Sequence, residues 1–151
     1  MNKNLERAIH KILEKNLSRL LRLSLGVIFI WFGAVKFIPG ASSAEWIATH
    51  TIEALTLGYV GPNVSLPALA FFETMLGFLF LSGKCVRLTT CLFLGHMLGT
   101  FTPLVLFPQL TFSKFPVAAT LEGQYIMKNI VLVVAGLAIW TLSYKEAEQA
   151  I

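Results

Sequence analysis

Six polar side chains stand inside or beside strongly apolar stretches of this chain, where such groups need a physical reason. They are Lys36, Glu73, His96, Glu122, Lys128 and Asn129. A charged side chain at the centre of a bilayer costs about 2.5–3.5 kcal/mol on insertion scales. Residues of this kind therefore pair with one another, face a wet cavity or mark a ligand or proton path. We take the six as candidates for ligand binding and ion pairing, and assign a catalytic role to none of them.

Glu73 is the hardest of these residues to explain as a surface charge. It lies well inside the apolar stretch 66–82, at a depth of roughly 10 Å, and its short side chain cannot reach the headgroups. We expect it to be protonated, paired or facing a wet cavity. Lys36, near the outer end of the first apolar stretch, either snorkels to the outer headgroups or pairs with Glu73. Gly77, one turn after Glu73, leaves room for a helix or ligand on the same face.

His96 is expected near the middle of the third apolar stretch, with Gly95, Gly99 and Thr100 around it. Two interpretations stand for it. A neutral histidine can form a hydrogen bond across helices, or it can relay protons with Glu73. A lone histidine gives no support to a haem site.

A second polar group, Glu122 with Lys128 and Asn129, begins the fourth apolar stretch. Glu122 and Lys128 form either a local ion pair or a solvated helix start. Aromatic residues precede and follow this point: Phe107, Phe112, Phe115 and Tyr125. They are typical of an interfacial belt, and the alternative is a wall around a lipid-soluble ring that Lys36, Lys128 and Glu122 contact.

Composition places these residues in a membrane. Of the 151 residues, 56% are hydrophobic and 13% are charged, whereas a soluble domain is about a quarter charged. Four stretches are long enough to cross a bilayer, at about residues 20–38, 66–82, 88–107 and 126–142. The sequence therefore predicts an all-α integral membrane protein, a four-transmembrane-helix bundle in a single domain, 1–151.

Two further helices are predicted outside the spans, and one break is predicted within the third span. Met1–Arg19 is an amphipathic helix expected on the inner membrane surface. Ser42 and Glu45 resemble a capping box that begins a short outer-surface helix ending near Gly58. Pro103 is expected to kink or end the third span. Small residues at Ser42–Ala44 leave a cleaved signal peptide as the rival interpretation of the first span, and we favour a retained first helix.

The distribution of Lys and Arg predicts the topology. With both ends inside, nine basic residues lie on the cytoplasmic side and three at or near the outer side, as the positive-inside rule requires. The net charge of +4 is carried by 1–22, with six basic and two acidic residues. That position favours anionic lipid over nucleic acid. Cys85 and Cys91 match no metal or thioredoxin spacing, so they are small apolar fillers or, alternatively, redox-active thiols.

Three segments resemble a known family. They are Arg22–Gly26 continuing through Phe29–Pro39 (RLSLG, FIWFGAVKFIP), Thr102–Val105 (TPLV) and Leu121–Asn129 (LEGQYIMKN). Together they resemble the YkgB/RclC family of inner-membrane proteins, which belongs with the broader DoxX-like four-helix proteins. One departure is the short loop after the first span, where the reactive-chlorine-resistance member has a longer insertion.

The resemblance implies a four-helix bundle in a bacterial inner membrane and a link to reactive-chlorine or other oxidant stress. DoxX-like relatives include a subunit of a thiosulfate:quinone oxidoreductase, which implies a quinone ligand or a soluble or membrane oxidoreductase partner. The leading hypothesis is therefore support of redox homeostasis or oxidant resistance. The alternatives are a small proton-coupled transporter or channel, and a structural subunit of a membrane complex. We do not expect the chain to catalyse a reaction alone, because the sequence contains no recognisable pattern for a redox cofactor site or an activated nucleophile.

Overall fold

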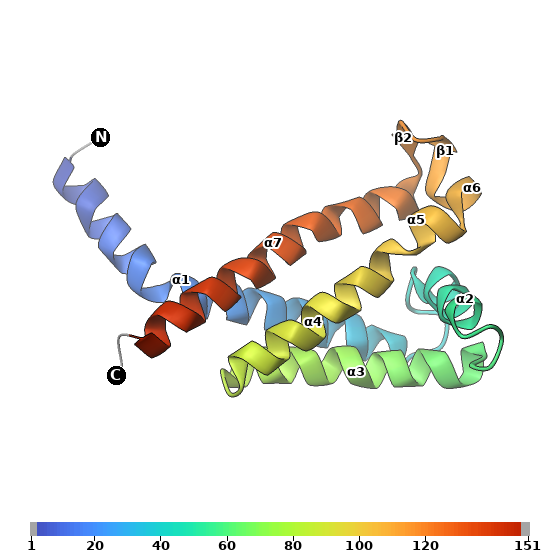
Figure 1. Ribbon diagram of the computed structural model, residues 1–151, viewed down its shortest axis with the longest axis horizontal. Coiled ribbons are helices and arrows are strands. Elements are labelled where there is room, and N and C mark those ends of the chain that lie inside the picture. The colour runs from blue at the N-terminus through green and yellow to red at the C-terminus, as the bar shows by residue number, and fades with distance from the viewer. Residues whose placement is uncertain (1–2, 149–151) are drawn as a thin grey trace.

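The computed structural model describes residues 3–148, and most of them lie in helices (Figure 1). In chain order the elements are α1 (Lys3–Lys36), α2 (Glu45–Leu55), α3 (Pro62–Ser82), α4 (Val86–Phe101), α5 (Pro103–Leu106), α6 (Pro108–Thr111), β1 (Phe112–Lys114), β2 (Ala118–Ala119) and α7 (Leu121–Glu148). The two short strands form one antiparallel hairpin. The predicted all-α bundle is confirmed, with this hairpin as its one addition within the described residues.

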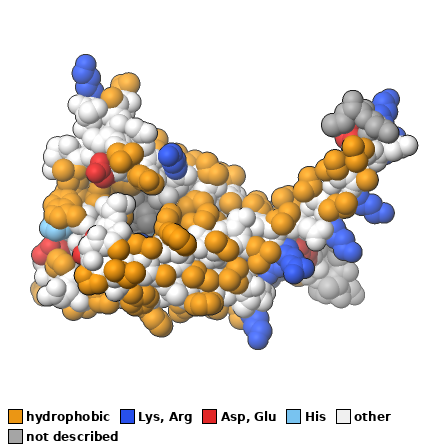
Figure 2. All heavy atoms as spheres, turned by 180° about the vertical axis from the view of Figure 1, so that it is seen from behind, with side chains coloured by type: hydrophobic (Ala, Val, Ile, Leu, Met, Phe, Trp, Pro, Cys, Tyr) orange, Lys and Arg blue, Asp and Glu red, His pale blue; other side chains and the backbone are white. Residues whose placement is uncertain are grey.

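Four helical segments of the described chain are long and apolar enough to cross a bilayer. They are Lys3–Lys36, Pro62–Ser82, Val86–Leu106 and Leu121–Glu148. These segments make up the body of the bundle, and α2 and the hairpin lie together at one end of it (Figure 1). Hydrophobic side chains cover much of the visible face of this body (Figure 2). A soluble core would hide such side chains, whereas lipid accepts them, so the chain is a multi-pass membrane protein.

The first helix is longer than the sequence predicts. The amphipathic segment and the first span, expected as two elements, are one continuous helix of 34 residues. At about 1.5 Å per residue, α1 measures roughly 51 Å, well beyond the ~30 Å of a hydrocarbon core. Its N-terminal part therefore extends past the rest of the bundle (Figure 1).

Glycines bring α1 and α3 close together. A Cβ at Gly33 would lie 2.6 Å from the backbone nitrogen of Thr74, and one at Gly77 would lie 2.8 Å from the carbonyl oxygen of Gly26. No larger residue fits without the helices moving apart. A core of buried side chains continues from this contact to α4 and α7: Leu25, Phe29, Leu76, Phe80, Phe93, Met97 and Ile139.

One of the two helix ends predicted from the sequence is found in the structure, and the other is not. α4 ends at Phe101 and α5 begins at Pro103, so the predicted break of the third span is confirmed. The predicted capping box is wrong. The N-cap of α2 is Ala44, which makes no side-chain cap, and the Glu45 carboxylate accepts a hydrogen bond from the Gly40 N–H. Ser42 lies two residues too early to cap the helix.

Candidate functional site

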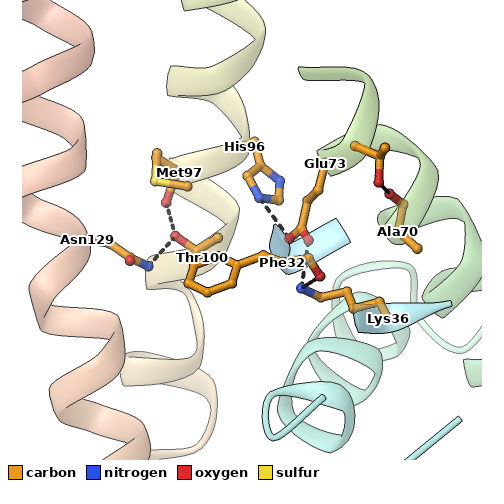
Figure 3. A network of polar contacts seen from close by, with 9 residues as sticks. Phe32, Lys36, Ala70, Glu73, His96, Met97, Thr100 and Asn129 are labelled. Atoms are coloured by element: carbon orange, nitrogen blue, oxygen red, sulfur yellow. Dashed lines mark hydrogen bonds and ion pairs between the residues drawn. The ribbon is translucent and has the colours of Figure 1, made fainter. Parts of the chain in front are cut away.

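Three ionisable side chains from three different helices meet inside the bundle (Figure 3). The Lys36 ammonium of α1 donates to Glu73 Oε2 of α3 at 2.6 Å. His96 Nε2 of α4 lies 3.4 Å from the other oxygen, Glu73 Oε1. The ammonium also donates to the carbonyl oxygen of Phe32 at 3.3 Å. We call Lys36, Glu73 and His96 the polar cluster.

The local sequence explains why the first two members meet. Gly33 and Lys36 are three residues apart and lie on one face of α1, as Ala70 and Glu73 do on α3. Gly33 packs directly against Ala70. A Cβ added at Gly33 would lie 2.8 Å from the carbonyl oxygen of Ala70. Because the two helices run antiparallel (Figure 1), Glu73 lies level with Gly33, and the Lys36 side chain extends back along α1 toward it, past the Phe32 carbonyl oxygen. The ammonium of Lys36, at the end of α1, can then reach the Glu73 carboxylate.

The polar cluster is almost fully enclosed. The side chains of Lys36, Glu73 and His96 are 7%, 8% and 10% exposed. Aromatic rings surround the imidazole, with the centroids of Phe29 and Phe72 at 5.7 and 5.6 Å. Such surroundings strengthen the attraction between the charges, and they also make an unpaired charge costly.

The attraction between His96 and Glu73 is weaker than that between Lys36 and Glu73, because the contact is longer and the charge of the imidazole depends on its protonation. At 3.4 Å the imidazole reaches the carboxylate as a donor only in a form that carries a proton on Nε2. One carboxylate thus lies between a lysine ammonium and a histidine ring. Chemically, the arrangement offers two donors and one acceptor in an enclosed site, which suits recognition of a polar group or exchange of a proton.

Asn129 forms a separate polar link, between α7 and α4. Its Nδ2 donates to Thr100 Oγ1 at 3.3 Å, and Thr100 donates in turn to the carbonyl oxygen of Met97 at 2.8 Å. Thr100 lies one turn beyond His96 on α4 (Figure 3). The link ties the two last spans together near the polar cluster without joining it.

Glu122 and Lys128 lie away from the cluster, and both are exposed. Within residues 3–148 no ion pair joins them. The Lys128 ammonium lies instead 5.4 Å from the centre of the Tyr125 ring. The aromatic residues singled out from the sequence divide into separate contacts, because Phe112 packs on Phe115 at 5.3 Å while Phe107 packs on Trp46 at 6.0 Å.

Sequence reasoning missed the groups that complete the cluster. Phe32 contributes its backbone carbonyl, four residues before Lys36, and this i−4 spacing was the available signal. Phe29 and Phe72 were indistinguishable from other apolar residues of their spans. Both cysteines are exposed thiols. In the part of the chain that the structure describes, no group of three His, Cys, Asp or Glu side chains could hold a metal ion.

Comparison with known families places this arrangement in a wider group. The model of the DoxX family matches residues 17–107. The chain belongs to the DoxX family. The DoxX match includes Lys36, Glu73 and His96, whereas Lys128 and Asn129 follow it. Neither a search of curated proteins nor a search of solved structures finds a match.

Proposed function

We propose that this DoxX-family protein supports redox homeostasis or oxidant resistance, including resistance to reactive chlorine, in a bacterial inner membrane. Its polar cluster would receive the polar head of a quinone, and the electrons would come from an oxidoreductase partner. The observation that supports this proposal is the convergence of Lys36, Glu73 and His96 from three helices at a site enclosed within the spans. The resemblance to the YkgB/RclC family supports the oxidant role, and the excess of inner Lys and Arg supports cytoplasmic termini.

A quinone head suits the chemistry of this cluster. Its carbonyl oxygen would accept a hydrogen bond from the Lys36 ammonium or from His96, while the rings of Phe29 and Phe72 offer apolar faces to the quinone ring. The Glu73 carboxylate would accept a hydrogen bond from the hydroxyl of the reduced form. Because the three side chains are enclosed, binding requires α4 to move away from α1 and α3.

The cellular test is survival in hypochlorous acid. Cells that lack the protein should become sensitive, and wild type should restore survival. Glu73→Gln and Lys36→Ala should fail to restore it at matched membrane abundance. Glu122→Gln, which changes an exposed carboxylate at the start of α7, is the matched control and should restore survival fully. If deletion leaves sensitivity unchanged, the oxidant role is wrong.

Ligand binding is tested separately on purified protein. A short-chain quinone analogue should raise the thermal unfolding temperature of wild type and of Glu122→Gln. It should leave the unfolding temperature of Glu73→Gln unchanged, because the carboxylate and its partners form the site. An equal shift in all three proteins would place binding elsewhere and contradict the quinone site.

Proton-coupled transport is the second candidate, and the contact of His96 with Glu73 favours it. The carboxylate holds Lys36 on one oxygen and His96 on the other, as a proton-exchanging group between two helices would. This candidate predicts pH-dependent flux in liposomes that Glu73→Gln abolishes. A third outcome supports a purely structural subunit: Lys36 and Glu73 variants lower the abundance of the protein, and every variant restores survival once abundance is matched.

A further inference from the structure

The N-terminal segment Lys3–Leu17, which we call the arm, is exposed along almost its whole length. Every residue from Lys3 to Lys15 is exposed, and Ser18 is the first buried residue of α1. In Figure 1 the arm leaves the end of the bundle opposite α2 and turns away from the bundle's long direction. The arm ends at the residue, Leu17, where the segment that the DoxX family model matches begins. Its sequence must therefore suit something outside the fold.

The arm has two chemically different faces. Basic residues recur at every fourth position, at Lys3, Arg7, Lys11 and Lys15. Apolar residues recur between them at helical spacing and are 41–63% exposed: Leu5, Ile9, Ile12, Leu13 and Leu17. With about 100° between successive residues, the two sets lie on broadly opposite sides of the helix. Figure 2 shows the hydrophobic side chains along one edge of the projecting arm and the basic ones along the other.

The charge of the arm selects its partner. Four basic and two acidic residues, Glu6 and Glu14, give 4 − 2 = +2 with His10 neutral. The arm of a second copy would bring the same positive charge and repel it. A polyanion in solution would satisfy the basic face and leave the apolar one in water. An anionic membrane surface satisfies both faces, because acyl chains accept the apolar side and long basic side chains reach back to headgroup phosphates.

We propose that the arm docks on the anionic phospholipid surface of the leaflet from which it emerges. The bend away from the bundle places it where a helix can lie against the membrane, and its continuity with α1 anchors it at the rim of the first span. This inference concerns the arm alone and does not depend on what the polar cluster binds. Each basic residue near such a surface contributes about a fivefold increase in docking.

The test follows a fluorophore on the full chain in nanodiscs, which expose both leaflets. Cys85→Ser and Cys91→Ser first remove the two exposed thiols. An environment-sensitive label is then placed by Ile9→Cys on the apolar face or, as the matched control, by Ala8→Cys on the polar face. The nanodiscs contain phosphatidylcholine alone or phosphatidylcholine mixed with phosphatidylglycerol. With phosphatidylglycerol, the label at position 9 should shift to the blue and become protected from a water-soluble quencher, while the label at position 8 stays accessible.

Removing the positive charges of the arm distinguishes the contribution of charge to docking from that of the apolar face. Arg7→Gln, Lys11→Gln and Lys15→Gln together should lower docking on phosphatidylglycerol by roughly a hundredfold. High salt should weaken docking of the wild-type arm in the same direction. Equal protection in both lipid mixtures would contradict an anionic partner. Protection that instead rises with two copies per nanodisc, whatever the lipid, would show that a second arm is the partner and overturn the proposal.

Discussion

The two halves of the bundle are held together in different ways. Between α1 and α3, glycines on both helices allow backbone contact, and the enclosed Lys36–Glu73 pair lies beside that contact. Between α4 and α7 the packing is close at Gly136, where a Cβ would lie 2.5 Å from the Phe93 ring. Further along α4, Gly95 and Gly99 have open space around them. There the described polar link is the hydrogen bond from Asn129.

This difference assigns distinct roles to the members of the polar cluster. Lys36 and Glu73 belong to the close-packed pair of helices, so their geometry is fixed by backbone contact. His96 belongs to α4, which has open space on part of its surface and reaches Glu73 over a longer distance. A movement of α4 would therefore change the contacts of the carboxylate on one oxygen while leaving the lysine on the other. The following three predictions test this contrast, from the largest expected effect to the smallest.

The largest effect is expected when one partner of the ion pair is removed. Lys36→Met leaves the Glu73 carboxylate enclosed without its cation, which should lower the free energy of unfolding by about 3–5 kcal/mol. Reversible unfolding in mixed detergent micelles measures this change. Lys128→Met is the control, because that lysine is exposed and its loss should change the free energy by no more than about 0.5 kcal/mol.

A double variant shows whether the effect arises from pairing. Lys36→Met with Glu73→Leu removes both charges, so the combined loss of stability should be smaller than the sum of the two single losses. If the two losses simply add, the contact seen at 2.6 Å contributes no coupling, and the contrast between the two halves does not rest on this pair.

The sequence predicts the spans well because lipid accepts apolar side chains, so hydropathy and length alone locate the helices. It also singles out Lys36 and Glu73, since charges are rare in such stretches. The two interpretations of Lys36, snorkelling to the headgroups or pairing with Glu73, could not be decided from the sequence. The two residues are separated by 37 positions, and their meeting depends on how Gly33 packs against α3. Periodicity within one helix contains no information about that contact.

Other features of the structure were not predicted from the sequence, for reasons that lie in short stretches of the chain. The amphipathic segment and the first span merge into α1 because no proline or glycine between residues 3 and 25 interrupts the helix. The hairpin between α6 and α7 was not predicted, since strands of three and two residues are too short to show an alternation of polar and apolar residues. Glu122 and Lys128 were expected as a second polar group, forming a local ion pair or a solvated helix start, and in the structure both are exposed.

The glycine contacts give the second prediction. At Gly33 an added methyl group would meet the backbone of α3, so Gly33→Ala should destabilise the protein by about 1–3 kcal/mol. At Gly99 nothing lies within 4 Å of the added atom, so Gly99→Ala should be neutral or stabilise the helix by up to about 1 kcal/mol. The opposite signs at two helical glycines test the contrast directly. If both substitutions changed the free energy of unfolding equally, the contact between α1 and α3 at Gly33 would be no closer than the surroundings of Gly99 on α4, and the contrast would fail.

The smallest effect is expected at the link between α4 and α7. Asn129→Leu removes the donor to Thr100, and hydrogen bonds between membrane helices average about 0.6 kcal/mol. A double-variant cycle with Thr100→Val isolates that coupling from other effects of either substitution, with unfolding followed in the same micelles. We expect a coupling several times smaller than that between Lys36 and Glu73. A coupling of equal size would show that one part-buried hydrogen bond holds the second half as firmly as the ion pair holds the first, and the division of the bundle into a fixed and a movable half would fail.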